Sequence, residues 1–388
     1  MRVDGGYNPF VKKSLGYYVK GLHFRIENDH STFLRQIKYH MKVQLLFAGL
    51  FISIFSLSCT GGADERNEAA TNGEVNVYTH RHYDTDQKLF KAFEDSTGIK
   101  VRVVSAGADE LIQRMKLEGL DSPADVLITV DAGRLHRAKE EGLLQRVESD
   151  ILQQFIPNSF KDTDNYWFGL TYRARILAYS PDRVSPDEIL DYESLAGEHL
   201  KGRVLVRSSS NVYNQSLAAS MLAYLGEEEF ERWTNLLVEN FARNPKGSDR
   251  DQIKAIASGE GDVALVNSYY VGKMLNSPNE REVEAARAVK VMFPNQENRG
   301  THVNVSGAGV AKGAPNRENA VKFIEFLVSE EAQKEFAAAN YEYPVREGVE
   351  FADLIQSWGS FKRDSINLSQ LGSFNNKAVI IMDKAGWK

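Results

Sequence analysis

The chain has 388 residues, of which 42% are hydrophobic, which is enough for more than one packed core. Its formal charge of −6 gives no indication of a nucleic-acid partner, and none is expected. The charge is unevenly divided, because residues 1–58 carry eight Lys or Arg and three acids, a net of +5 that leaves −11 for the remainder. A basic leader before an acidic body is typical of an exported protein with its targeting segment attached.

The leader contains a predicted signal peptide. From Met41 the sequence reads MKVQLLFAGLFISIFSLSC, in which one lysine precedes an apolar stretch that ends in small residues and Cys59. An apolar stretch of about fifteen residues is too short for a stable transmembrane helix and is typical of a signal-peptide core. We therefore take Met41 as the expected true start and leave residues 1–40 out of the fold.

Cys59 is the only cysteine of the chain, so it cannot form an internal disulfide. Its place directly after the apolar stretch resembles the lipid-attachment cysteine of bacterial lipoproteins, although Ser56 stands where leucine is usual. The alternative is cleavage nearby, which would leave a free cysteine in a flexible tail. Residues 60–74 are small and polar, so we divide the N-terminal part into a leader (1–58) and a lipid-anchored tether (59–74).

From Val75 onward the pattern alternates between strands and helices. Apolar stretches predict strands over 75–78, 101–105 and 124–130, and helical periodicity predicts helices over 84–98, 110–119 and 131–142. The first helix places Leu89, Phe90 and Phe93 on one face and has Gly98 at its end. Apolar strands separated by amphipathic helices predict a covered, mostly parallel sheet.

A long strand over 167–180 then interrupts this pattern and could cross into a second lobe. A second series follows, with strands within 202–210, 261–270 and 289–296, and helices over 213–224, 227–242 and 249–258. The extended segment 301–313 could cross back, and it leads to a helix over 316–329 and a helical tail. We predict an α/β protein with a hinge and an interlobe cleft, in which 75–172 plus 305–388 form lobe 1 and 173–304 form lobe 2.

Sequence signatures of catalysis are missing from this chain. It contains no P-loop, no dinucleotide-binding glycine pattern, no metalloprotease motif and no nucleophile elbow, and the body has no cysteine. This argues against an enzyme.

Tyrosines follow three of the predicted strands. Tyr83 follows VNVY, Tyr213 follows VLVR, and Tyr269 and Tyr270 follow VALVN. Ligands of α/β proteins bind at the carboxyl ends of strands, so these side chains are candidates for a site in the cleft. Packing and helix capping are the competing explanations, and an adjacent tyrosine pair is expected by chance in a chain with 16 tyrosines.

A phenolate is a hard oxygen ligand, and ionising a phenol of pKa about 10 at pH 7 costs roughly 4 kcal/mol. A trivalent ion such as Fe(III) can offset that cost for several phenols, whereas a divalent ion gains little over carboxylate ligands. Four phenolates around Fe(III) would leave one negative charge, which a nearby guanidinium such as Arg173 could balance. The alternative use of converging tyrosines is stacking on a sugar or an aromatic solute.

Several stretches together carry a family resemblance, namely RHYDTD, SPADVLITVDAGRL, RSSSNVYNQS, VNSYYVGK, FPNQENRGTHVNVSGAGV and the terminal KAGWK. They resemble the ferric-iron-binding proteins of bacterial ABC uptake systems, in the subfamily that holds iron with a tyrosine cluster. The resemblance covers about 75–388 and implies a type II periplasmic-binding-protein fold of two lobes. It also implies a periplasmic monomer that closes over Fe(III) and delivers it to an ABC permease in the inner membrane.

The resemblance also implies roles for individual residues. It makes Tyr83, Tyr213, Tyr269 and Tyr270 iron ligands, with His82 as a conditional ligand. Arg173 would balance charge near the metal, and Lys273 occupies the place of a second basic residue found in some relatives. A synergistic anion such as carbonate is used in the family, but with four tyrosines we expect none to be obligatory.

Neighbouring polar residues have simpler interpretations. We expect His80 not to be a ligand, Asp84 and Asp86 to stabilise the first turn of their helix, His302 to be structural, and Arg207 to form hydrogen bonds within its lobe. Two other functions stay open. One is the same fold binding another solute, such as an anion, a polyamine or a sugar, and the other is an enzyme or signalling module on this scaffold.

Overall fold

A computed structural model describes residues 73–81 and 83–388 of the chain. The predicted leader, most of the tether including Cys59, and His82 lie outside the described residues, so the predictions made for them concern parts not described here. Within the described ranges, no helix is both long enough and apolar enough to cross a membrane.

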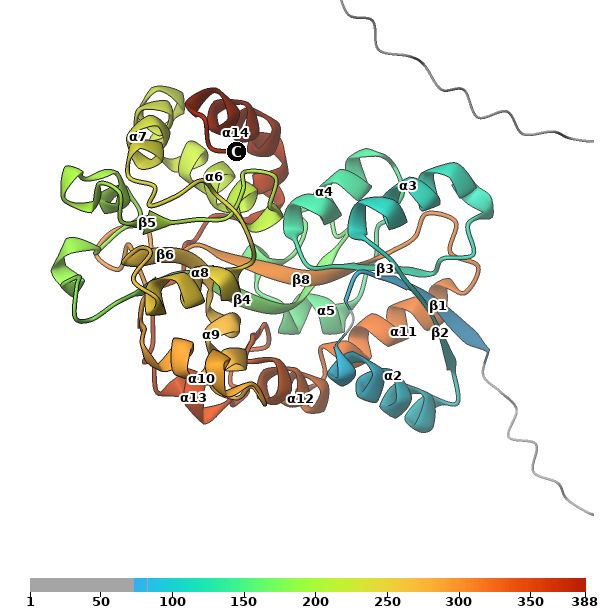
Figure 1. The fold of residues 1–388 in the computed structure, drawn as a ribbon. Helices are drawn as coiled ribbons and strands as arrows, with labels where there is room; N and C mark the ends of the chain where they lie inside the picture. The colour runs from blue at the N-terminus through green and yellow to red at the C-terminus, as the bar shows by residue number, and fades with distance from the viewer. Residues whose placement is uncertain (1–72, 82) are drawn as a thin grey trace, which may run out of the picture. The chain divides into compact units, whose positions relative to one another are not determined.

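A mixed sheet runs through the molecule in the order β2-β1-β3-β8-β4-β6-β5, with β7 and β9 also paired to β4 (Figure 1). The strands are β1 (Glu74–Thr79), β2 (Lys100–Ser105), β3 (Val126–Thr129), β4 (Phe168–Tyr179), β5 (Val204–Leu205), β6 (Val263–Asn267), β7 (Lys290–Met292), β8 (Val303–Val310) and β9 (Tyr343–Pro344). β1 is parallel to β2 and β3, and β5 is parallel to β6. β4 and β8 are antiparallel to each other and to their neighbours. The expectation of a mostly parallel sheet is therefore wrong in the middle, because there the chain crosses between the two halves.

β4 belongs to both halves of the sheet. Its residues 168–174 pair with β8, and its residues 175–179 pair with β6. β8 continues in the opposite direction to pair with β3, and both strands are buried along their whole length. These strands correspond to the two predicted crossovers and divide the described chain into two lobes. The lobe boundaries at 172/173 and 304/305 stay predictions.

Helices lie on both sides of the sheet in the first lobe (Figure 1). They are α2 (Asp84–Thr97), α3 (Ala108–Glu118), α4 (Ala132–Glu140), α5 (Asp150–Phe155), α11 (Arg317–Leu327) and α12 (Glu330–Asn340). The apolar face predicted for α2 is confirmed, since Leu89, Phe90 and Phe93 are buried. The Phe93 ring meets Phe323 of α11 edge to face, with ring centroids 5.1 Å apart. Gly98 ends α2 at φ 72°, a conformation that favours glycine.

The second lobe is built around β5 and β6. Its helices are α6 (Val212–Leu225), α7 (Glu227–Glu239), α8 (Asp249–Ala257), α9 (Ser268–Leu275) and α10 (Glu280–Arg287), and the C-terminal part adds α13 (Asp353–Gln356) and α14 (Leu371–Ala385). α14 packs on α6 and α7 as well as on α4, so the last helix lies against the second lobe although residues 305–388 were assigned to the first. After α14, the buried Trp387 donates a hydrogen bond from Nε1 to the carbonyl oxygen of Arg207 at 2.8 Å.

Short 3-10 helices complete the described chain: η1 (Gly119–Asp121), η2 (Asn158–Phe160), η3 (Pro186–Glu188), η4 (Glu193–Ala196), η5 (Glu198–Leu200) and η6 (Leu368–Gln370). One strand is much shorter than its predicted segment, because only Val204–Leu205 of 202–210 pairs with β6. The residues after it turn toward α6, where the side chain of Asn211 caps the helix by accepting a hydrogen bond from the Tyr213 amide at 3.1 Å. This turn places Tyr213 at the start of a helix.

Candidate metal centre

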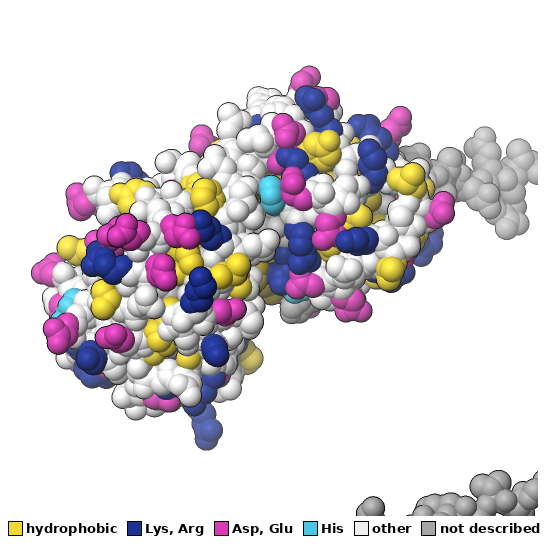
Figure 2. Space-filling view, turned by 90° about the horizontal axis from the view of Figure 1, so that it is seen from above, with side chains coloured by type: hydrophobic (Ala, Val, Ile, Leu, Met, Phe, Trp, Pro, Cys, Tyr) yellow, Lys and Arg dark blue, Asp and Glu magenta, His cyan; other side chains and the backbone are white. Residues whose placement is uncertain are grey.

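The four predicted tyrosines line one cavity of about 460 Å³ between the lobes. Tyr83 is the N-cap residue of α2, Tyr213 lies in the first turn of α6, and Tyr269 and Tyr270 lie in the first turn of α9. Seen from above, the molecular surface is hollowed between its two halves, with Lys and Arg side chains along the margin (Figure 2). The fold thus brings together the four tyrosines that the sequence pattern predicts, although they come from three separate stretches of the chain.

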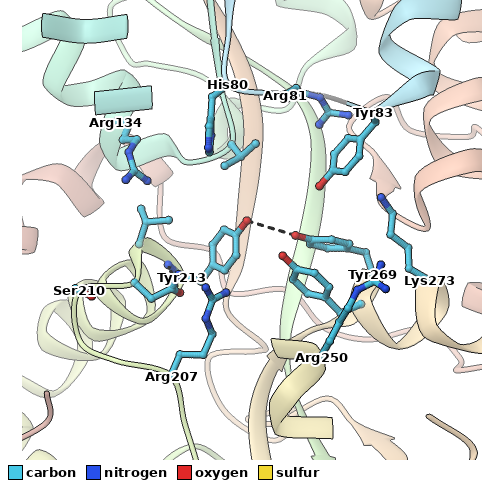
Figure 3. A pocket seen from close by; sticks show the side chains of 14 residues that line it. His80, Arg81, Tyr83, Arg134, Arg207, Ser210, Tyr213, Arg250, Tyr269 and Lys273 are labelled. Atoms are coloured by element: carbon cyan, nitrogen blue, oxygen red, sulfur yellow. Dashed lines mark hydrogen bonds between the residues drawn. The ribbon is translucent and has the colours of Figure 1, made fainter. Parts of the chain in front are cut away.

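The phenol groups point toward one another. The hydroxyls of Tyr213 and Tyr269 are 3.3 Å apart, and the hydroxyl of Tyr83 faces the same space from the opposite lobe (Figure 3). The rings of Tyr269 and Tyr270 lie side by side, with centroids 4.2 Å apart and planes inclined by 30°. Phenolic oxygens from both lobes therefore surround a common point.

Burial disfavours ionisation of these phenols in the metal-free protein. Burial, together with the nearby Glu342 carboxylate, raises the pKa of Tyr83 to about 12. Burial also raises the pKa values of Tyr269 and Tyr270, and each is raised further by the charge that neighbouring tyrosines would carry. At pH 7, ionising a phenol of pKa about 12 costs roughly 7 kcal/mol, so these groups are neutral until a strong cation arrives.

Basic side chains dominate the remaining lining of the cavity. His80, Arg81, Arg134, Arg207, Arg250 and Lys273 lie along it, and none of its described lining residues is an Asp or Glu. Most of these arginines are held by carboxylates outside the cavity: Arg134 by Asp109 at 2.9 Å, Arg250 by Glu282 at 2.6 Å, and Arg207 by Asp249 at 3.6 Å. Sequence reasoning missed Arg134 and Arg250, because neither adjoins a tyrosine in the sequence.

Arg173 and Lys273 occupy different positions around the tyrosines. Arg173 is buried on β4 behind Tyr213, with its guanidinium carbon 5.3 Å from the centre of that ring, and it donates a hydrogen bond to the carbonyl oxygen of Val130. It lines a small adjoining cavity rather than the main one. The ammonium of Lys273 lies 3.6 Å from the centre of the Tyr83 ring, and burial lowers the pKa of Lys273 to about 8. Both cations are within reach of negative charge that develops on the phenols.

A buried ion cluster supports the loop that carries Tyr83. Arg81 is fully enclosed and pairs with Asp86 at 3.0 Å and with Glu342 at 3.2 Å. Asp86 is thus turned toward Arg81 in the first turn of α2, whereas Asp84 is exposed in the same turn. Neither aspartate lines the cavity, and the interpretation that they stabilise the first turn of the helix stays a prediction.

The histidines differ in their placement. His80 lines the cavity, and the expectation that it is not a ligand stays a prediction. His302 is buried at the start of β8 away from the main cavity, and burial together with Arg175, Arg173 and Arg299 lowers its pKa to about 3. A neutral, enclosed imidazole at the crossover fits the structural role predicted for it.

The donor set restricts the chemistry of this centre. Within residues 73–81 and 83–388, no group of three or more His, Cys, Asp or Glu side chains is arranged to hold a metal ion. The converging donors are phenolic oxygens, which are hard ligands suited to a hard, highly charged cation. Divalent ions that prefer thiolates, imidazoles or carboxylates have little reason to choose this cavity over other sites.

Comparison with known proteins shows the family to which this chain belongs. The sequence profile described as "Bacterial extracellular solute-binding protein" matches residues 88–363. The chain belongs to this family. It is 49% identical over 359 residues to the iron uptake protein A1 of Synechocystis sp. (strain ATCC 27184 / PCC 6803 / Kazusa), a match that covers 89% of this chain and 100% of that protein.

Two solved structures of related solute-binding proteins superpose on this fold. One is the Trichodesmium protein (IdiA, FutA) in complex with iron and citrate ligands, with 49% identity, a TM-score of 0.80, and coverage of 81% of this chain and 100% of that chain. The other is the ferric binding protein from Campylobacter jejuni, with 42% identity, a TM-score of 0.77, and coverage of 81% and 100%. The two-lobed periplasmic-binding-protein fold expected from the sequence is thereby confirmed.

Proposed function

We propose that this protein captures Fe(III) outside the cytoplasm, through tyrosinate ligands in its interlobe cleft, and delivers the iron to an ABC permease. The observation that carries the proposal is the convergence of four phenols from both lobes on one cavity with no carboxylate in its described lining. The relatives named for iron uptake and ferric binding support the same cargo. As in those proteins, the role is binding and transfer rather than catalysis.

In this proposal Tyr83, Tyr213, Tyr269 and Tyr270 are the iron ligands, and His82 is a conditional fifth ligand. Four phenolates and Fe(III) sum to one negative charge, which Arg173 beside Tyr213 and Lys273 beside Tyr83 offset. The charge of the trivalent ion compensates for the cost of ionising buried phenols. A synergistic anion such as carbonate is then optional, and the positive lining would accommodate one.

We further propose that the protein acts as a monomer held at the membrane by a lipid on Cys59, after removal of a signal peptide that begins at Met41. The tether would let the lobes reach a permease in the inner membrane. Labelling with a radioactive fatty acid tests the anchor: the wild-type protein should incorporate label and the Cys59→Ser variant should not. Equal labelling of the two proteins would refute the assignment.

The cargo is tested by titrating the purified protein with ferric nitrilotriacetate and recording its visible absorption. Tyrosinate ligation should give a phenolate-to-iron charge-transfer band that saturates at one equivalent of iron. Absence of a band in the wild-type protein would overturn the proposal.

A second candidate function is binding of an anionic solute in the same cleft. The arginines Arg134, Arg207 and Arg250 along the cavity favour an anion and disfavour a polyamine. For an anionic cargo, exchanging the tyrosines for phenylalanine would leave solute affinity largely unchanged, whereas for ferric iron it would abolish binding.

A further inference from the structure

Arg175 lies at the point where β4 changes partners. Ala174 is the last residue of β4 that pairs with β8, and Arg175 is the first that pairs with β6, opposite Asn267. The Arg175 side chain is 1% exposed, so its guanidinium has no contact with solvent. A buried charge at such a position must be held by protein groups.

The partners of Arg175 come from the beginnings of three helices. Its Nη1 lies 3.1 Å from Oδ2 of Asp249, the first residue of α8, and donates to Oδ1 of Asn267, the N-cap residue of α9, at 3.2 Å. Its Nη2 donates to Oδ1 of Asn214, in the first turn of α6, at 2.7 Å. One guanidinium thus joins three helix starts that are far apart in the sequence.

Two of these helix starts carry the tyrosines of the candidate centre. Asn214 directly follows Tyr213, and Asn267 precedes Tyr269 by two residues. The arrangement is reinforced by Asp249, whose Oδ2 also accepts a hydrogen bond from the Asn267 amide at 3.0 Å. A shift of α6 relative to α9 that separates the phenols would therefore also disturb the bonds at Arg175.

We propose that Arg175 is a positioning residue of the metal centre. It fixes the first turns of α6 and α9 so that the hydroxyls of Tyr213 and Tyr269 lie 3.3 Å apart, ready to share one ion. This inference rests on the proposed function. Arg175 differs from Arg173 in how it acts, because Asp249 neutralises the charge of Arg175 and leaves geometry as its contribution.

Only an arginine meets these requirements. The planar guanidinium donates hydrogen bonds in fixed directions to acceptors on three helices. A lysine ammonium is a single charged group at the end of a flexible side chain. Arg175→Lys keeps a positive charge beside Asp249 but loses the two Nη groups that bond to the three helices. The variant therefore shows the effect of positioning without a change of charge.

The test compares Arg175→Lys with Arg299→Met, a control at another buried arginine. The Arg299 side chain is 5% exposed and pairs with Glu193 at 2.6 Å, and neither residue lines the tyrosine cavity. Each purified variant is titrated with ferric nitrilotriacetate while the charge-transfer band is recorded, and its free energy of unfolding is measured without iron. We expect Arg175→Lys to lower iron affinity about 10- to 100-fold and to shift or weaken the band. Arg299→Met should lose stability and keep both the band and the affinity.

Wild-type iron affinity and an unchanged band in Arg175→Lys would overturn the inference. Equal losses of affinity in Arg175→Lys and Arg299→Met, with no change of the band in either, would also overturn it. If Arg175→Lys does not fold, Asn267→Ala carries the test, because the Asn267 side chain gives no capping bond to α9 and its oxygen accepts from Arg175. We expect it to lower affinity about tenfold, and unchanged affinity would overturn the inference. A wild-type protein without any band would instead refute the proposed function.

Discussion

The two lobes contribute to the cavity in different ways. The first lobe supplies Tyr83 on a loop whose neighbour Arg81 is fixed by Asp86 and Glu342. The second supplies Tyr213, Tyr269 and Tyr270 on the first turns of two helices, tied together beneath the surface by Arg175. The second lobe therefore carries three of the four proposed iron ligands, and the first lobe carries the fourth across the cleft. The contrast suggests that iron meets the second lobe first and that Tyr83 completes the set on closure.

Acidification should have the largest effect on iron binding. Because burial keeps the phenols of Tyr83, Tyr269 and Tyr270 neutral in the metal-free protein, each of them releases one proton on ligation, and affinity should fall about tenfold per pH unit for every proton released. Measuring the affinity for ferric nitrilotriacetate between pH 8 and pH 5, corrected for the chelator, gives the number of protons. Tyr83→Phe should lower this number by one, and the Tyr269→Phe/Tyr270→Phe double variant by two. An affinity independent of pH would contradict tyrosinate ligation.

Removing the hydroxyls of Tyr269 and Tyr270 should have the second-largest effect on iron affinity. Tyr269→Phe combined with Tyr270→Phe removes two adjacent oxygens, and we expect affinity to fall by more than about 100-fold, beyond what changes outside the ligand shell cause. The visible band should disappear or shift strongly in the same titration. Tyr224→Phe is the matched control, because Tyr224 is 54% exposed near the end of α6 and away from the cavity. A normal band in the double variant would show that these tyrosines are not ligands.

Removing the first-lobe donor should be less damaging. Tyr83→Phe keeps the three phenols of the second lobe, so a charge-transfer band should persist while affinity falls by about 10- to 100-fold. If Tyr83 completes the set on closure, the variant should also release iron faster to a competing chelator, as stopped-flow absorption can measure. A variant that loses all binding would reverse the proposed order, with the first lobe as the primary site.

The smallest effect concerns His302, where the crossover strands join the lobes. Its folded pKa of about 3 lies below the ordinary value of 6.5, so the unfolded chain binds a proton that the folded protein excludes. Stability is thus lost as pH falls from 6.5 toward 3, and by pH 5 the loss is about 2 kcal/mol. Urea unfolding of the iron-free protein at pH 7 and pH 5 should show this loss in wild type and in His199→Gln, an exposed control, but less in His302→Gln. Equal pH dependence of stability in all three proteins would show that His302 does not cause the loss.

Much of this architecture follows from local sequence patterns. The buried face of α2 and the long strand β4 are predicted by apolar periodicity, and the tyrosines are found because they lie a few residues after apolar strands. The mixed direction of the central strands is not predicted, since strand pairing depends on the path of the whole chain. The sequence also does not predict three arginines near the site, namely Arg134, Arg250 and Arg175. Tertiary packing brings each of them to the cavity or to the helices that carry the tyrosines, and no regular spacing in the sequence indicates this.

The hydrogen bond from Trp387 to the Arg207 carbonyl ties the end of the chain to the turn that precedes Tyr213. The two bonded residues are 180 positions apart, so the segment before Tyr213 is braced by a part of the chain that is distant in the sequence. A nascent chain that has formed β5 and α6 therefore lacks this brace until Trp387 has been synthesised and packed into place.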